Sequence, residues 1–439
     1  MTAAPKTNVS PLDIKIVGAG MAGLSAAISC ALAGHNVVVL EGARELAEVG
    51  AGFQVTPNGC RVLQQYGLLE DLRRSAAEPT LLQVRRWSDG KVLSRTDDFN
   101  VEMKSKYNAP FWDLHRVDVQ RALAAKAKEL GVEVRLGSRI EDVDFDQATI
   151  RLASGETLQA DLIVGADGLW SKCRQKFLMS KGLEPDIPIP TGDLAYRIVL
   201  EVNEVKSQEV KDWISQPTCQ FWIGPEAHVV AYSVRNGQMI NIVLLVPDNL
   251  PPDVSKQSGS LEEMRAIFNH WDPMLNRFLD EVKSVEKWKL MHGAELDSWI
   301  SPKSNFVFVG DACHSMLPYL AQGANSAIED GAVLGNILTA VESRSQLPAA
   351  LKLHEQLRKK RGEAIVRETF AQRKDFHMPD GEEQAKRDEL MLGQLGKQIE
   401  GKFPSRWQCP EVQPWLYGYD AKEEVERALK AQPLASVSA

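Results

Sequence analysis

Apolar residues near the start of the chain form two short runs, and a stretch of small residues separates them. Residues 13–17 and 36–40 are mostly apolar, whereas residues 22–33 are rich in Ala and Ser. Short continuous apolar runs are typical of buried parallel strands, and the segment between these two has the length of a helix. The pattern therefore predicts a strand, helix, strand unit, which is the repeating element of an α/β fold.

Segments in the middle of the chain predict a second, largely antiparallel sheet. A turn at 154–155 separates two segments that we expect to pair as a hairpin, residues 148–152 and 158–164. The buried-strand pattern returns at residues 305–309, before a helical stretch at 325–341, so the first sheet is expected to resume there. Strands of the second sheet are predicted at residues 195–202, 219–223, 229–234 and 239–246.

Beyond Ala349 the pattern changes to long amphipathic helices with many charged residues. Acidic and basic residues are interleaved there, as in residues 380–387, which favours a solvated helix surface over a patch for nucleic acid or membranes. Residues 421–439 are expected to fray.

The composition is that of a folded, enzyme-sized protein. The chain has 439 residues, of which 44% are hydrophobic and 25% are charged. This length is enough for about two or three domains. The formal net charge is -8, and this acidic balance argues against nucleic acid as a partner.

The cysteines and the N-terminal segment bear on the compartment. Isolated cysteines argue against a zinc site or a disulfide framework, so reduced thiols inside the cell are expected. Residues 1–12 lack a secretory signal pattern, which favours a cytoplasmic protein. Residues 16–34 carry no charge, but their glycine cluster argues against a membrane span. The cysteines are Cys30, Cys60, Cys173, Cys219, Cys313 and Cys409.

A glycine-rich turn connects the first predicted strand to the helix. Gly18, Gly20 and Gly23 form the spacing G-x-G-x-x-G, and Glu41 closes the second strand. Gly18 permits a tight turn, Gly20 lets the backbone approach a pyrophosphate, and Gly23 lets the helix pack closely on the sheet. Glu41 can accept hydrogen bonds from a ribose diol and would repel a phosphate there. FAD or NAD is therefore expected at this site, and a glycine-rich turn of an ordinary α/β core is the alternative.

Two further motifs accompany this fingerprint. Residues 165–174 read GADGLWSKCR, which contains the pattern D-G-x-x-S-x-x-R, and residues 310–314 read GDACH, followed by QGAN at 322–325 and ED at 329–330. With the fingerprint and the turn at 49–54, these motifs make residues 12–345 resemble the flavin-dependent aromatic hydroxylases. Those are single-component FAD monooxygenases of the salicylate hydroxylase and p-hydroxybenzoate hydroxylase type, and the fungal salicylate hydroxylase-like branch is the most similar.

The resemblance implies an α/β fold of the p-hydroxybenzoate hydroxylase type. Its parts are a Rossmann-like FAD-binding domain, an inserted and largely antiparallel β-sheet substrate domain, and C-terminal helices. We expect residues 11–78, 109–180 and 291–345 to form the discontinuous FAD-binding domain. The substrate-binding domain is expected at 79–108 and 181–290, and the helical region at 346–439.

Further cofactor-binding residues are expected on the same grounds. The resemblance implies contacts to FAD from Gly52 and Gln54, and from Arg116 and Asp167. Asp311 follows a buried strand, where its carboxylate can hold ribityl hydroxyls, although a helix N-cap is the alternative role. For Arg116 the alternative is an exposed ion pair. A helix is expected to begin near Gly323, so that Ala324 and Asn325 lie at its N-terminus, where free amides stabilise negative charge.

The resemblance also implies the reaction. Non-covalent FAD would be reduced by NAD(P)H and would pass oxygen from dioxygen to a phenol or aromatic acid through a flavin hydroperoxide, without a metal. Arg197 and Tyr232 are the candidate catalytic residues, since an Arg and a Tyr bind the phenolate in similar fungal enzymes. A salt-bridged strand Arg and a cross-strand aromatic are the alternatives for them. Tyr196 is expected on the strand face opposite Arg197.

Other functions stay open at this point. The same chemistry could epoxidise or dearomatise a larger heteroaromatic secondary metabolite. From other classes, a flavoprotein reductase or dehydrogenase without oxygen insertion and a non-catalytic nucleotide-binding protein are alternatives. A monomer or a homodimer is expected, with no nucleic acid and no membrane span. His314 is expected to satisfy buried backbone groups rather than act as a base.

Overall fold

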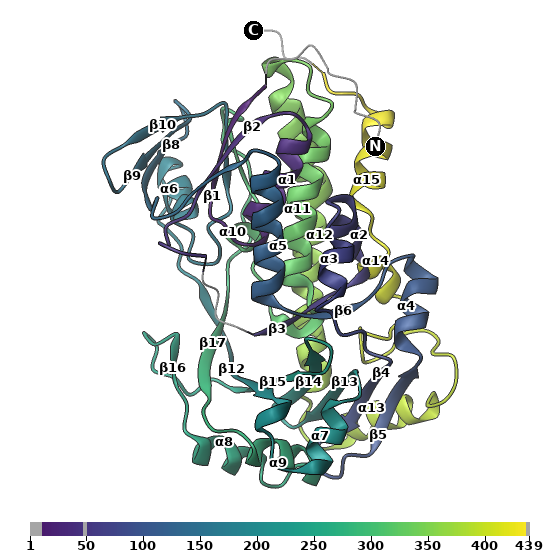
Figure 1. The fold of residues 1–439 in the computed structure, drawn as a ribbon. Coiled ribbons are helices and arrows are strands. Elements are labelled where there is room, and N and C mark those ends of the chain that lie inside the picture. The colour runs from purple at the N-terminus through teal and green to yellow at the C-terminus, as the bar shows by residue number, and fades with distance from the viewer. Residues whose placement is uncertain (1–10, 47–50, 436–439) are drawn as a thin grey trace.

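The computed structural model describes residues 11–46 and 51–435. Long helices join its two main sheets (Figure 1). The predicted unit is present as β1 (Asp13–Val17), α1 (Met21–Leu32) and β2 (Asn36–Leu40). The strand order of this parallel sheet is β18-β11-β1-β2-β7, with β7 at Glu133–Arg135, β11 at Leu162–Gly165 and β18 at Phe306–Phe308. The predicted return of the first sheet near residue 305 is confirmed.

Small residues let two helices approach each other closely beside this sheet. α11 (Gln322–Leu338) packs along α1, and α5 (Arg116–Glu129) also contacts α1 (Figure 1). A Cβ atom added at Gly331 would lie 2.3 Å from the backbone nitrogen of Ala26, and one at Gly335 would lie 2.2 Å from Ser29 Cβ. Larger residues at either position would push the helices apart.

The hairpin prediction is correct in its first half and wrong in its second. β9 (Thr149–Leu152) pairs antiparallel with β10 (Thr157–Gln159) and with β8 (Ile140–Asp144). Residues 158–164 are not one strand, however, because the chain changes sheets after β10. The amide of Asp161 donates to the carbonyl oxygen of Asp13 at 2.8 Å, and β11 then runs parallel to β1.

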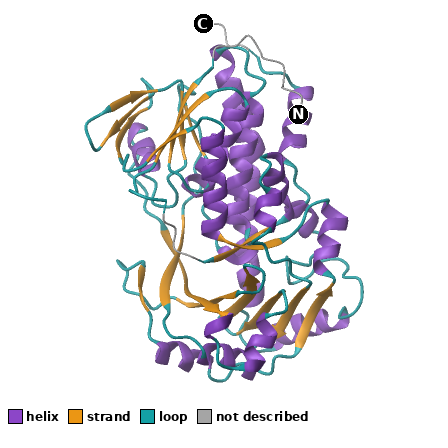
Figure 2. Cartoon of the chain, in the orientation of Figure 1, coloured by secondary structure: helices purple, strands orange, loops and turns teal. Residues whose placement is uncertain are grey.

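The second sheet is largely antiparallel, as predicted, and lies in the lower part of Figure 2. Only β13 and β4 pair in parallel within the strand order β16-β17-β12-β15-β14-β13-β4-β5. α7 (Gln208–Ile214), α8 (Leu261–Phe268) and α9 (Pro273–Asp280) cover its outer face. The strands are β4 (Leu81–Arg86), β5 (Val92–Asp97), β12 (Ile189–Glu201), β13 (Thr218–Gly224), β14 (Ala227–Val234), β15 (Met239–Pro247), β16 (Lys256–Ser258) and β17 (Glu286–His292).

A small ladder lies between the two sheets. β3 (Gly52–Val55) pairs antiparallel with β6 (Trp112–His115), and Figure 1 places this pair above the second sheet. The remaining short helices surround these layers. They are α2 (Pro57–Gln65), α3 (Leu69–Arg73), α4 (Phe99–Tyr107), α6 (Lys172–Ser180) and α10 (Asp311–His314).

The C-terminal region is helical, as predicted, but its last helix does not fray. α12 (Leu347–Phe376), α13 (Glu382–Gly393), α14 (Gln413–Tyr417) and α15 (Ala421–Ala431) follow one another along the chain. The carboxylate of Asp420 caps α15 by accepting from the amides of Lys422 and Glu423 at 2.9 and 3.1 Å. Ala421 and Val425 are buried in the same core as α11. The fraying prediction is therefore wrong for α15, because this apolar face has a partner.

The charge-free segment 16–34 contains α1, whose residues are mostly buried in the protein core. No helix in the described part of the chain has the length and apolar character that crossing a bilayer requires.

Candidate cofactor and substrate cavity

A cavity of about 940 Å³ extends from the parallel sheet to the inner face of the second sheet. Its volume is near the upper end of the ~300–1,000 Å³ that is usual for ligand pockets. Segments far apart in the sequence line it together, from the turn after β1 to the C-terminal region. The predicted site residues on its wall are Gly18, Gly20, Glu41, Gly52, Gln54, Arg116, Asp167, Arg197, Tyr232, Asp311, Gly323 and Ala324.

The three fingerprint glycines have different surroundings. Gly18 has a φ of +104°, and a Cβ there would lie 2.4 Å from the carbonyl oxygen of Ala166. A Cβ at Gly23 would lie 2.0 Å from the carbonyl oxygen of Gly18, so this position serves helix packing, and Gly23 does not line the cavity. A Cβ at Gly20 would meet no atom within 4 Å. Gly20 is the N-cap residue of α1 at the cavity wall, and its open side suits a phosphate at the helix N-terminus.

Two backbone amides fix the carboxylate of Glu41 at the end of β2. Oε2 accepts from the amide of Ala19 at 2.8 Å, and Oε1 accepts from the amide of Ala43 at 2.8 Å. The carboxylate thereby joins the glycine turn to the loop after β2. Because each oxygen has a further lone pair, Glu41 can still accept from a ribose hydroxyl in the cavity.

Gly52 brings the small β3–β6 ladder and the second sheet together at the cavity. Its amide donates to Asn241 Oδ1 at 3.0 Å, and a Cβ at Gly52 would lie 2.9 Å from Tyr232 Cε2. A side chain at this position would therefore separate β3 from β14 and β15. Residues 49–50 of the turn predicted beside the flavin lie outside the described residues.

Asn325 does not line the cavity but supports residues that do. It is fully buried in the first turn of α11, and its Nδ2 donates to the carbonyl oxygen of Gln54 at 2.9 Å. Its Oδ1 accepts from the amide of Thr56 at 3.2 Å. Asn325 therefore holds β3 against the N-terminus of α11, and Gly323 and Ala324 present that N-terminus to the cavity.

The acidic candidates Asp167 and Asp311 differ in burial. Asp167 accepts from the amide of Cys173 at 2.9 Å, and burial raises the pKa of its carboxyl. Asp311 is exposed toward the cavity in the first turn of α10, and Gly310 occupies the N-cap position. The N-cap alternative for Asp311 is therefore wrong. Arg116 begins α5 directly after β6, and its side chain borders the cavity.

Arg197 and Tyr232 reach the cavity from the inner face of the second sheet. The guanidinium carbon of Arg197 lies 4.5 Å from the centre of the Trp288 ring. Burial, and then the charge of Arg116, lowers the pKa of Arg197, but a guanidinium stays protonated in proteins. Burial and the nearby Asp113 raise the pKa of Tyr232 well above its usual value, so its hydroxyl keeps its proton. The two groups can stabilise a phenolate, one by charge and one by donating a hydrogen bond.

Successive side chains of a strand point to opposite faces of the sheet, so the residue next to Arg197 does not face the cavity. Tyr196 lies in the core cluster on the outer face, whereas Arg197 faces the cavity. On β13, Phe221 lines the cavity, whereas its neighbour Trp222 packs into the outer core.

Three lining residues had no recognisable signal in the sequence. His228 lies on β14, Tyr319 follows α10, and Trp407 comes from the C-terminal region, where amphipathic helices with a solvated charged surface were expected. Trp407 Nε1 donates to the carbonyl oxygen of Tyr319 at 3.1 Å, which holds the C-terminal segment against the cavity. Such contacts depend on tertiary packing and leave no local pattern.

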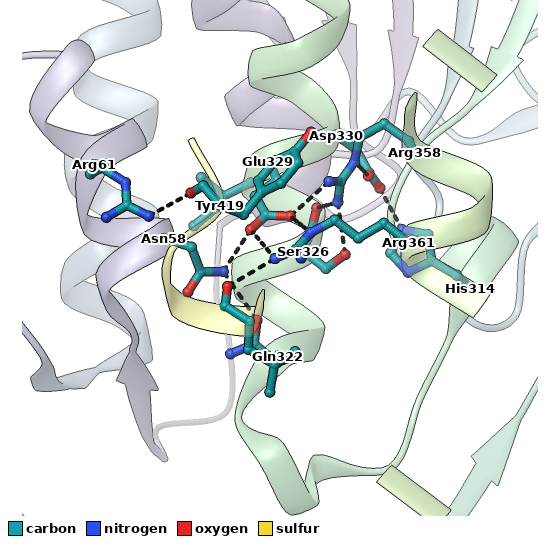
Figure 3. Close-up of polar contacts among 12 residues, drawn as sticks. Asn58, Arg61, His314, Gln322, Ser326, Glu329, Asp330, Arg358, Arg361 and Tyr419 are labelled. Carbon is teal, nitrogen blue, oxygen red and sulfur yellow. Dashed lines mark hydrogen bonds and ion pairs between the residues drawn. The ribbon is translucent and has the colours of Figure 1, made fainter. Parts of the chain in front are cut away.

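A buried ion-pair network lies between α11 and α12 (Figure 3). Arg358 contacts Glu329 at 2.8 Å and Asp330 at 2.6 Å, and Arg361 contacts Glu329 at 2.9 Å. His314 bonds to Asp330, and Asn58 Nδ2 donates to Glu329 Oε1 at 2.6 Å. His314 is not part of the cavity wall, but its ring bonds to the Asp330 carboxylate and not to the buried backbone groups that were expected.

The same network contains a cluster of possible metal ligands among the described residues. Cys313, His314 and Asp330 offer ligand atoms within 4.8 Å of one another. Both oxygens of Asp330 already have partners, however, because Oδ1 accepts from Arg358 and Oδ2 from the amide of Gly310. Burial raises the pKa of the Cys313 thiol, which disfavours a thiolate ligand. These contacts are those of an ion-pair network.

Comparison with known proteins agrees with this geometry. The family model described as "FAD binding domain" matches residues 11–369. FAD-dependent monooxygenase OpS4 of Beauveria bassiana is 50% identical over 413 residues, which cover 94% of this chain and 96% of that protein. The 3-amino-4-hydroxybenzoate 2-monooxygenase of Streptomyces cremeus is 32% identical over 93% of this chain and 96% of its own. The structure of a salicylate hydroxylase substrate complex has a TM-score of 0.78 at 22% identity, covering 98% of this chain and all (100%) of that one.

Proposed function

Because the chain belongs to the FAD-binding domain family, and within it to the FAD-dependent monooxygenases, we propose that the protein hydroxylates a phenol or aromatic acid with NAD(P)H and dioxygen. The observation that carries this proposal is the shared cavity, whose wall holds the dinucleotide fingerprint at one end and Arg197 with Tyr232 at the other. A single cavity lets a cofactor ring and a substrate meet.

The residues on the cavity wall fit non-covalent FAD. The open face of Gly20 and the amides at the start of α1 suit the pyrophosphate, and Glu41 suits the adenosine ribose. Asp311 can accept from ribityl hydroxyls, and the amides of Gly323 and Ala324 suit a ring that gains negative charge. When bound, FAD supplies the redox and oxygen-transfer chemistry that no side chain provides.

The protein would orient the substrate and exclude water. Arg197 would hold the phenolate oxygen by charge, and Tyr232 would donate a hydrogen bond to it, which keeps the ring electron-rich. The wall beyond them is mostly apolar, with Phe221, Val230 and Leu245 among its residues, and would keep water from the reacting atoms. The names of the relatives support an aromatic acid or phenol, since four of them specify hydroxybenzoates.

We propose that different segments of the chain bind the cofactor and the substrate. Residues 11–78, 109–180 and 291–345 would bind FAD, and residues 79–108 and 181–290 would bind the substrate. Trp407 would complete the substrate end from the C-terminal region. We further propose a monomer or homodimer in the cytoplasm, and the six buried cysteines without disulfide bonds support that compartment.

Labelled dioxygen tests the proposed reaction. Phenols, aromatic acids and indoles are screened with the FAD-loaded protein for stimulated NAD(P)H consumption, and the products are analysed by mass spectrometry. Incorporation of one labelled oxygen atom into an aromatic product supports hydroxylation. A labelled product that has lost its aromatic ring would indicate epoxidation or dearomatisation instead. NAD(P)H oxidation without labelled product would reassign the protein as a reductase.

A further inference from the structure

A histidine lines the part of the cavity wall that Arg197 and Tyr232 do not occupy, and a second histidine bonds to it from outside the wall. His228 lies on β14 and lines the cavity, and only 1% of its surface is exposed. Its Nδ1 lies 2.6 Å from Nε2 of His377, which ends α12 and is 8% exposed. One ring must donate and the other accept in this hydrogen bond. Nε2 of His228 is then the ring nitrogen left for a ligand.

The position of His228 along β14 sets its distance from the predicted phenolate site. His228, Val230 and Tyr232 are two residues apart on the strand, so their side chains share one face, and all three line the cavity. Four residues of strand span roughly 13 Å, at ~3.3 Å for each residue. The face between the two polar ends is apolar, since Val230 pairs with Val243 and His228 pairs with Leu245. This spacing fits an elongated aromatic molecule with a polar group at each end.

Charge around the histidine pair favours a neutral partner. Burial lowers the pKa of His228 well below its usual value and lowers that of His377 to about 4, so both rings are neutral near pH 7. The charged groups behind them are already paired, because Arg373 Nη2 donates to Asp193 Oδ1 at 2.6 Å. The hydroxyl of Tyr319 also donates to Asp193. An anionic group beside His228 would therefore be buried without a counter-charge.

We propose that His228 is a second substrate-binding residue, which recognises a hydroxyl or keto oxygen at the far end of an elongated aromatic substrate through Nε2. His377 is its positioning residue, since the hydrogen bond to Nδ1 fixes the orientation of the ring and couples the tautomers of the two histidines. The subsite discriminates against a carboxylate at that end. This inference rests on the proposed function, which places the reacting phenol at Arg197 and Tyr232.

Ligand binding to the FAD-loaded protein without NAD(P)H tests the subsite apart from catalysis. The probes are 4-hydroxybiphenyl, 4,4′-dihydroxybiphenyl and 4′-hydroxybiphenyl-4-carboxylate, and dissociation constants are measured by calorimetry. A neutral hydrogen bond predicts about 3- to 10-fold tighter binding of the diphenol than of the monophenol. An unpaired buried charge predicts at least about tenfold weaker binding of the carboxylate than of the diphenol.

Variants assign the preference to the histidines. His228→Phe should bind the monophenol and the diphenol equally, whereas His228→Gln, which keeps a polar acceptor, should retain part of the preference. His377→Leu should reduce the preference and His377→Gln should restore it, because glutamine can still bond to His228 Nδ1. His270→Gln on the surface is the matched control, and the flavin absorbance of each variant reports folding.

Three outcomes would overturn the inference: no binding of the biphenyls to the unsubstituted protein, tighter binding of the carboxylate, or a diphenol preference that survives His228→Phe. Labelled oxygen in a product together with any of these would reject the subsite alone. A His228-dependent preference without oxygen insertion would instead retain the subsite and reject the proposed function.

Discussion

Gln54 and Asp113 are joined by a hydrogen bond of 2.9 Å from the side-chain nitrogen of Gln54 to Oδ1 of Asp113. The same nitrogen also contacts Cys219 Sγ at 3.4 Å. Both amide protons are thus directed into the protein, and the carbonyl Oε1 is the polar atom that Gln54 can offer to the cavity. Gln54 is therefore expected to accept a hydrogen bond from a bound ring rather than donate one.

The protonation state of Asp113 follows from its surroundings. Asp113 is buried, and its Oδ2 has no hydrogen-bond partner among the described residues. Burial raises the pKa of its carboxyl well above the usual value, against the smaller opposing effect of Gln54. The folded protein therefore keeps a proton here that the unfolded chain releases above about pH 4.

We predict that Asp113→Asn becomes more stable relative to the unsubstituted protein as the pH rises from 4 toward 7. In that range the unfolded chain binds fewer protons at Asp113 than the folded protein, so the raised pKa makes folding less favourable at higher pH. One group contributes at most about 1.4 kcal/mol for each pH unit. Denaturant unfolding at several pH values measures the difference, and Asp253→Asn on the surface controls for the lost charge. A constant difference across pH would show that Asp113 is ionised in the folded protein.

Local sequence patterns predicted much of the cofactor end of the site. The apolar runs at 13–17 and 36–40 predicted the strand, helix, strand unit, and the fingerprint glycines act within its first turn and its helix. Alternation along β12 likewise placed Tyr196 and Arg197 on opposite faces, because the strand period is fixed by the backbone.

Contacts between distant segments could not be predicted in this way. The break between β10 and β11 depends on the pairing of Asp161 with Asp13 in another strand. Trp407 reaches the cavity because its indole bonds to Tyr319, and no periodicity in residues 399–412 indicates that contact. Asn325 was placed at a helix N-terminus correctly, but its bonds to β3 required the folded chain.

Gly20 and Gly23 should respond differently to substitution by alanine. Gly23→Ala places a methyl group 2.0 Å from the Gly18 carbonyl oxygen and should cost about 1–3 kcal/mol of folding free energy. Gly20→Ala has open space on the protein side, so its free energy of unfolding should change little while its affinity for FAD falls. Denaturant titration and calorimetric FAD binding to the apoprotein separate the two effects. Equal loss of stability in both variants would remove the distinction.

Arg358 should be essential to the buried network beside α11. Burial opposes ionisation of Asp330, but the charges of His314 and Arg358 outweigh it and lower the pKa of the carboxyl. Arg358→Met would leave Glu329 and Asp330 with less compensation and should cost about 3–5 kcal/mol of stability. Arg277→Ala removes an exposed pair with Glu209 and should cost less than about 1 kcal/mol. Similar losses for both variants in denaturant unfolding would contradict the role given to Arg358.

Arg197 should control product formation more than cofactor binding. Because a charged hydrogen bond contributes about 1.5–3 kcal/mol, Arg197→Ala should weaken binding of a phenolic substrate by roughly 10- to 100-fold. Its flavin absorbance should persist, since the fingerprint, Glu41 and Asp311 lie on other elements. NAD(P)H consumption should then be less coupled to oxygenated product. The exposed Arg95→Ala on β5 is the control, and an unchanged product yield from Arg197→Ala would exclude Arg197 from the substrate site.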